Sequence, residues 1–149
     1  MHMKPWAGII TEEEERRYQS AGFGGVGGFG IRPALLIIDV QYRTVGTTRQ
    51  PYWDAIKEYP TSCGDFGWQA VDRIAPLLGM FRAKRFPVLY PYVAPKNAAT
   101  DGGRLAEKIP SIMGIDARGY DFVDEVAPVT GDVLPVSYTH LTLPTTRHV

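Results

Sequence analysis

A carboxylate at the end of an apolar run is the first feature of this sequence that could do chemistry. In "RPALLIIDVQYR", residues 32–43, Asp39 follows an unbroken aliphatic run from Leu35 to Ile38. Such a run is typical of a strand in a parallel sheet that is covered on both faces. Ligands of open parallel sheets bind beyond the carboxyl ends of the strands, so Asp39 stands where a catalytic carboxylate would act. The alternative is a carboxylate that accepts backbone N–H bonds from the next loop, and position alone leaves both open.

The residues after Asp39 separate two reaction classes. Phosphatases of the haloacid-dehalogenase type carry D-x-D-x-T, in which the first Asp attacks phosphorus and the second transfers the leaving-group proton. Here Gln41 takes the place of the second Asp, although Thr44 is suitably placed. Because an amide cannot donate that proton, the sequence favours the other class, in which Asp39 acts as a base toward a thiol.

Composition restricts the class of protein. The chain has 149 residues, 44% of them hydrophobic, with 16 basic and 16 acidic side chains. This composition predicts one soluble globular domain without an electrostatic footprint for nucleic acid or a membrane surface. Small molecules or proteins are the expected partners. The start of the chain lacks a secretory core, and no apolar run approaches the roughly 20 residues of a membrane span, so a cytoplasmic location is expected. The single cysteine, Cys63, excludes an internal disulfide and a multi-cysteine metal site.

Helix and strand signals alternate along the chain. Thr11 with Glu14 predicts a capped N-terminal helix. The glycines of residues 22–30 fit G-x-G-x-x-G, but they follow a predicted helix and precede a strand. That order is the reverse of a dinucleotide-binding unit, so we expect a lead-in segment and no cofactor.

A strand, a long helix and a second strand follow in the central part of the chain. Apolar residues recur at helical spacing in "WQAVDRIAPLLGMFRAKR", where Pro76 predicts a kink or a late start, and "FPVLYPYV" at 86–93 reads as a buried strand. The segment between the first strand and this helix predicts loops with at most one helical turn, "DGGRLAEKIPSIMG" at 101–114 predicts a loop leading to a short helix, and "GDVL" at 131–134 begins like a third strand. This order predicts a parallel α/β sheet covered on both faces.

Several separate segments, in the same order, resemble isochorismatase-like cysteine hydrolases. They are "GGFG", "RPALLIIDVQYR", "RAKRFPVLYPYVAPK" and "GRLAEKIPSI…DFVDEVAP…GDVL", and the resemblance covers about residues 5–134. The branch similar to N-carbamoylsarcosine and maleamate amidohydrolases fits best. The resemblance implies a three-layer α/β/α sandwich with a mostly parallel sheet of strand order 3-2-1-4-5-6, of which this chain would encode the first three strands.

The resemblance also implies an Asp-Lys-Cys catalytic set, of which the chain supplies one member. Asp39 matches the aspartate that accepts the thiol proton. The lysine should end the third strand, yet Lys96 and Lys108 lack that context and are expected on the surface. Cys63 precedes the position of the nucleophile, so we expect an incidental or structural thiol, with nucleophilic attack as the alternative.

The end of the chain departs from the family pattern. "SYTHLTLPTT" resembles the translation of a sequencing-library adapter, and a native Thr-rich end is the alternative. We therefore expect residues 1–134 to be the N-terminal part of a hydrolase domain and residues 135–149 to be a non-native tail. Without the lysine and the cysteine, the chain is expected to be inactive.

The expected substrate is a small amide or carbamoyl compound, hydrolysed at a C–N bond without a metal or cofactor. Gln41, Arg43 and Tyr92 follow predicted strands and are expected to line the substrate pocket, where an arginine would suit a carboxylate-bearing substrate. Members of the family commonly form dimers or tetramers, so the full-length parent is expected to be a homo-oligomer. The alternative to an enzyme is a non-catalytic α/β domain that binds a small molecule or a protein.

Overall fold

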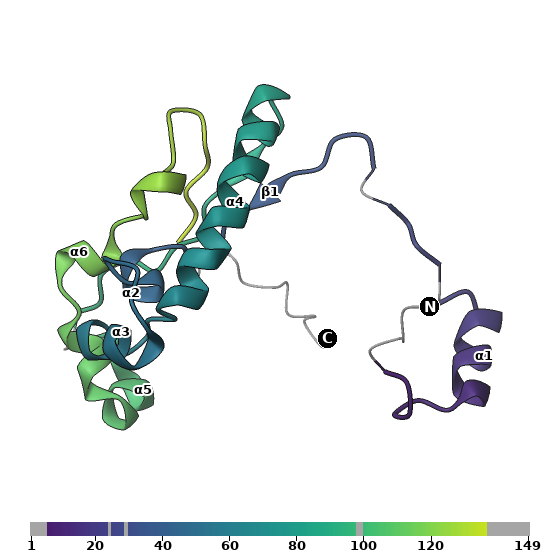
Figure 1. Ribbon diagram of the computed structural model, residues 1–149, viewed down its shortest axis with the longest axis horizontal. Coiled ribbons are helices and arrows are strands. Elements are labelled where there is room, and N and C mark those ends of the chain that lie inside the picture. Colours follow the sequence, from purple (N-terminus) through teal and green to yellow (C-terminus); the bar gives the residue numbers. More distant parts are fainter. Residues whose placement is uncertain (1–5, 24, 29, 98–99, 137–149) are drawn as a thin grey trace, which may run out of the picture. The chain divides into compact units, whose positions relative to one another are not determined.

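The computed structural model describes residues 6–23, 25–28, 30–97 and 100–136. The chain divides into two compact units, Met1–Arg32 and Pro33–Val149 (Figure 1). The first unit holds helix α1, Glu12–Ser20. The backbone N–H of Glu14 donates to Thr11 Oγ1 at 3.2 Å, and that of Thr11 donates to the Glu14 carboxylate at 2.9 Å. The predicted capping box is confirmed.

The second unit is built on a parallel strand pair. Strand β1, Leu35–Leu36, pairs with β2, Val88–Leu89, and Leu35 lies opposite Val88. The pairing continues beyond the assigned strands, because the Asp39 N–H donates to the Pro91 carbonyl at 2.8 Å. The fold is therefore mixed α/β, with a parallel connection as the sequence predicts.

A third extended segment lies on the other side of β2. The Tyr90 N–H donates to the Val133 carbonyl at 2.7 Å, and parallel bridges join Leu89 to Val133 and Tyr92 to Val136. The order across the sheet is therefore β1, β2 and residues 133–136, and the strand predicted to begin near 131–134 is present as these bridges.

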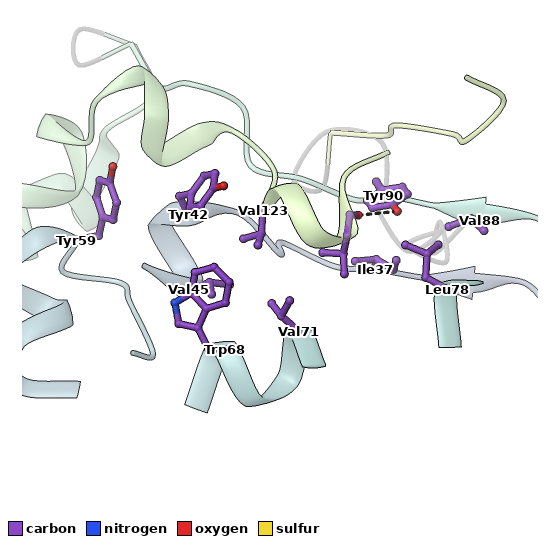
Figure 2. Packing of buried hydrophobic residues seen from close by; sticks show 11 residues of the cluster. Ile37, Tyr42, Val45, Tyr59, Trp68, Val71, Leu78, Val88, Tyr90 and Val123 are labelled. Atoms are coloured by element: carbon purple, nitrogen blue, oxygen red, sulfur yellow. Dashed lines mark hydrogen bonds between the residues drawn. The ribbon is translucent and has the colours of Figure 1, made fainter. Parts of the chain in front are cut away.

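The expectation that β1 is covered on both faces is wrong for the described residues. Ile37 is 3% exposed, but its neighbours Leu36 and Ile38 are 48% and 56% exposed. Figure 2 shows Ile37 in the same core as Leu78 of helix α4 and Tyr90, so that face is packed. Successive side chains of a strand point to opposite faces. The face that carries Ile37 is therefore buried, and the face that carries Leu36 and Ile38 is exposed.

Helix α4, Asp65–Ala83, forms the long crossover between the two strands. Its buried side chains are Trp68, Val71 and Leu78. Figure 2 shows Trp68 and Val71 directed toward Val45 and Val123. The helix continues through Pro76, so the predicted late start is wrong. Within the described residues, no helix combines the length and apolar character required to cross a membrane.

Short helices lie in the connections, some where the sequence predicts loops and one in the segment 101–114, where the sequence predicts a short helix. Helices α2, Tyr42–Val45, and α3, Tyr52–Glu58, precede α4. After β2 come α5, Gly103–Lys108, the 3₁₀ turn η1, Pro110–Gly114, then α6, Ala117–Tyr120, and η2, Asp124–Val126. Helices α2 and α6 lie side by side (Figure 1). Helix α4 approaches α2 at Gly67, where an added Cβ would lie 3.0 Å from Val45 Cα.

The end of α4 offers a stabilising substitution. Arg85 has φ 54°, its N–H donates to the Arg82 carbonyl, and the Phe86 N–H donates to the Phe81 carbonyl, both at 3.0 Å. This is a Schellman motif with a non-glycine residue in the left-handed position. We expect Arg85→Gly to raise the free energy of unfolding by about 0.5–1 kcal/mol, because glycine adopts this conformation without steric cost. Urea denaturation of the variant measures the gain, and an unchanged or lower value would contradict it.

Candidate functional site

Asp39 lies three residues beyond β1, at the carboxyl end of the extended pairing with the β2 segment. Its backbone has φ 54°, a left-handed conformation that is uncommon for residues other than glycine. The Asp39 N–H donates to the Pro91 carbonyl, while its own carbonyl accepts from the Gln41 N–H at 2.9 Å. The chain thus turns sharply at this residue. A strained backbone at the mouth of a sheet is typical of a functional position.

The half-buried Asp39 lines an open hollow of about 360 Å³ between the end of β1 and helix α4. Most of the lining is apolar, and Asp39, Thr44 and Cys63 contribute its polar side chains. The remaining lining residues are six apolar residues and one glycine: Ile38, Val40, Val45, Phe66, Gly67, Ala70 and Ile74. A carboxylate at the edge of an apolar hollow can accept a proton from a ligand or a thiol that enters it.

Cys63 is brought to the same hollow as Asp39, which sequence order alone does not indicate. The loop before α4 carries it there, because the Cys63 N–H donates to the Thr44 carbonyl at 2.8 Å. Its side chain is exposed. Cys63 and Asp39 therefore line the same hollow, as the alternative in which Cys63 is the nucleophile requires.

Gln41 occupies a position unlike the predicted pocket wall. The residue is 0% exposed, and its amide Nε2 donates to the carbonyls of Val93 at 3.0 Å and Tyr120 at 2.6 Å. The Val93 N–H donates back to Gln41 Oε1 at 2.9 Å. The side chain faces the backbone of two other segments, so it joins β1 to the end of β2 and to α6.

Arg43 and Tyr92 are also separated from the Asp39 hollow. Neither residue is part of its lining. Arg43 is 5% exposed and its guanidinium carbon lies 5.1 Å from the centre of the Tyr120 ring. Tyr92 packs edge-to-face on Phe122 at 5.6 Å. The structure therefore does not bring together the three residues predicted to bind substrate. Lys96 and Lys108 are likewise absent from the lining of the hollow.

A buried polar cluster that the sequence did not indicate lies at the other end of α4. Arg82 Nη2 donates to Asp132 Oδ2 at 2.7 Å, to Tyr90 Oη at 3.0 Å and to the Ala127 carbonyl at 3.0 Å. Tyr90 Oη donates to the Val126 carbonyl at 2.8 Å, the bond drawn in Figure 2. Because these groups come from distant segments and bond to one another, the cluster links α4 to β2 and to the segment around residue 132.

A second hollow, of about 290 Å³, lies between the end of α3 and the segment from η1 to α6. Its lining includes Tyr59, whose Oη donates to Asp116 Oδ1 at 3.0 Å. The same carboxylate oxygen caps α6 by accepting the Gly119 N–H at 2.9 Å. Burial, with Asp116 as acceptor, raises the pKa of Tyr59 to about 12. Tyr59 and Asp116 are therefore engaged in a hydrogen-bond network that joins the end of α3 to α6.

Substitution of Asp39 tests its backbone conformation separately from its charge. Asn tolerates the left-handed region, whereas a β-branched residue does not. We expect Asp39→Asn to keep the midpoint of thermal unfolding, and Asp39→Val to lower the free energy of unfolding by about 1–2 kcal/mol. Thermal and urea denaturation of both variants check this. Equal stabilities would contradict the left-handed assignment.

Buried tyrosines predict a loss of stability at high pH. Burial raises the pKa of Tyr90 to about 12. An unfolded tyrosine ionises near pH 10, so the stabilising effect is complete below that value. It is lost as the pH rises toward 12, by up to about 1.4 kcal/mol per pH unit for each such tyrosine. Urea denaturation between pH 9 and 11 measures the slope. Tyr90→Phe is expected to be less stable at pH 8 and to show a shallower slope, and an identical slope would contradict the prediction.

Comparison with known proteins identifies no family for this chain. No family model matches the chain, and no curated protein matches it. The class that fold and site define is therefore a parallel α/β unit with a strand-end carboxylate over an open apolar hollow.

Proposed function

We propose that this chain is the N-terminal part of a cysteine hydrolase of the isochorismatase-like type, acting on a small amide or carbamoyl C–N bond, with Asp39 as general base. In this proposal the parent domain is a three-layer α/β/α sandwich, active in the cytoplasm as a homo-oligomer without a metal or cofactor. The parallel bridge from β2 to Val133 supports it, since the order β1, β2 and Val133 agrees with the 3-2-1 half of the strand order that the resemblance implies.

The observation that carries the proposal is the place of Asp39. The carboxylate stands at the carboxyl end of β1, on a left-handed backbone, and lines a hollow large enough for a small ligand. A carboxylate held there can take the thiol proton, which makes the sulfur a nucleophile toward an amide carbon. The resulting covalent intermediate is then released by water.

The chain as printed is proposed to lack turnover, because a lysine to hold the thiolate charge is absent from the hollow's lining. Purified chain should release no ammonia from a panel of small amides. The decisive control is a pair of variants. Activity that disappears in both Asp39→Asn and Cys63→Ser would contradict the proposed inactivity and would make Cys63 the nucleophile.

The gene itself tests the parent function. Reading the coding sequence past codon 134 should reveal a native continuation with a lysine at the strand end and a later cysteine. In that full-length protein, Asp39→Asn is expected to lower kcat/KM by about 10²- to 10⁴-fold while preserving the fold. A native continuation that contains "PVSYTHLTLPTT", or an active Asp39→Asn protein, would overturn the proposal.

One observation favours a non-catalytic binding domain instead. The hollow is lined mostly by aliphatic and aromatic side chains, which suit an apolar ligand without any reaction. Alkylation of thiols in the full-length protein discriminates between the two functions. It abolishes turnover in the enzyme and leaves binding largely unchanged in the binder.

A further inference from the structure

The guanidinium of Arg43 is a buried cation that forms no ion pair with another described residue. The residue is 5% exposed, and among the described residues its Nη1 atom has no hydrogen-bond partner. The hydrogen bond from Thr61 Oγ1 to Arg43, at 2.7 Å, is accepted by the backbone carbonyl and not by the side chain. Burying a charge without a partner is strongly unfavourable, so such a group points to an anion that completes the site.

Four carboxylates of α3 and of the segment around α6 have partners other than Arg43. Glu58 accepts from Gln50, Asp116 accepts from Tyr59 and Gly119, and Asp121 and Asp124 accept from Arg118. These residues belong to α3 and to the segment around α6, which packs against α2. Among the described residues no carboxylate forms an ion pair with Arg43, because Asp121 and Asp124 pair with Arg118 while Glu58 and Asp116 accept from neutral donors.

We propose that Arg43 forms a binding site for a small carboxylate between α2 and α6. The guanidinium carbon of Arg43 lies 5.1 Å from the centre of the Tyr120 ring, which is a cation–π distance, and the ring covers the guanidinium from one side. Hydrogen-bond donors of a guanidinium lie in its plane, and among the described residues the buried Nη1 has no acceptor. A planar carboxylate matches such in-plane donors, and the burial of Arg43 admits only a small ligand or the carboxylate end of one.

This site is distinct from the hollow at Asp39. Arg43 is not part of the lining of that hollow, and the buried Gln41 stands between the two positions in sequence. The inference therefore goes beyond the proposed hydrolase function. A protein without turnover can still bind a carboxylate at Arg43, and a failure to bind one leaves the role of Asp39 unaffected.

Thermal unfolding of the full chain tests the site with acetate as the probe. Replacing chloride by acetate at the same ionic strength, at about 100 mM, is expected to raise the midpoint by about 2 °C or more in the wild-type chain and not in Arg43→Met. In chloride alone, Arg43→Met is expected to raise the midpoint by about 3 °C or more, because it removes an uncompensated buried charge.

A second arginine provides the matched control. Arg49 also lies over an aromatic ring, 4.9 Å from the centre of the Trp68 ring, but it is paired with Asp72 at 2.6 Å. Arg49→Met should give no gain in chloride and should keep the full response to acetate. The proposal is overturned if Arg43→Met lowers the midpoint in chloride while acetate acts equally on all proteins, or if phosphate stabilises the wild-type chain more than acetate.

Discussion

Replacing Gln41 by leucine is expected to lower the free energy of unfolding by about 3–5 kcal/mol, a loss comparable with the whole stability of many small domains. The amide of Gln41 donates to two carbonyls and accepts one N–H, with all three bonds between 2.6 and 3.0 Å. Leucine fills a similar volume but leaves those groups of Val93 and Tyr120 without partners. Each buried polar group that loses its partner costs about 1–3 kcal/mol.

Urea denaturation and thermal unfolding measure this effect, and a second variant keeps the test informative if the first does not fold. In Gln41→Glu, one carboxylate oxygen can still accept the Val93 N–H, while the other faces two carbonyls and needs a proton to donate. Burial and these acceptors should raise the pKa of the new carboxyl. The variant is therefore expected to lie closer to wild-type stability at pH 4 than at pH 7.

An exposed glutamine provides the control for this prediction. Gln69 lies on the solvent side of α4, and Gln69→Leu is expected to change the free energy of unfolding by no more than about 0.5 kcal/mol. A Gln41→Leu protein as stable as Gln69→Leu would show that the buried amide is dispensable.

The sequence predicts the parallel strand pair because its determinants are local. Two apolar runs flank a segment with helical spacing, and this pattern alone requires a parallel connection between β1 and β2. The capping box of α1 is equally local, because Thr11 and Glu14 satisfy each other's backbone donors. What the pattern could not decide is how many faces are covered, since an apolar run looks the same whether or not a second layer packs against Leu36 and Ile38.

Contacts between distant segments account for the features that the sequence did not indicate. Three of the four residues of helix α2, Tyr42, Thr44 and Val45, are poor helix formers. The helix forms because Gln41, at its N-cap, is anchored to residues 52 and 79 positions further along the chain. The position of Gln41 after a strand suggested a ligand contact, but tertiary packing uses its amide for the backbone. The cluster of Arg82, Tyr90 and Asp132 likewise spans up to 50 residues and has no local pattern.

The place of Asp39 is the part of the candidate site that follows from sequence, because strand ends in parallel sheets converge on a ligand crevice. Its left-handed backbone and the arrival of Cys63 at the same hollow depend on the turn and on the loop before α4. The separation of Arg43 from that hollow also depends on tertiary structure, since the packing of α2 against α6 determines which side of the short helix faces Tyr120.

Exposed apolar residues along β1 lead to the second large prediction, which concerns self-association. Leu35, Ile37 and Asp39 donate their N–H groups toward β2, so the alternate amides of Leu36 and Ile38 point to the opposite edge, as parallel pairing requires. These two side chains are also 48% and 56% exposed. An apolar edge strand without charged residues is a template for pairing with another chain, and a formal net charge of zero gives no repulsion to oppose it.

We expect the chain to form oligomers or aggregates whose size increases with concentration, as measured by size-exclusion chromatography with light scattering. Ile38→Lys is expected to shift most of the material to monomer, because a lysine on an edge strand prevents edge-to-edge pairing. Val129→Lys provides the matched control, since Val129 is 53% exposed but lies outside β1. If both variants dissolve the oligomers equally, added charge alone is responsible. If neither does, the β1 edge is not the contact through which the chains associate.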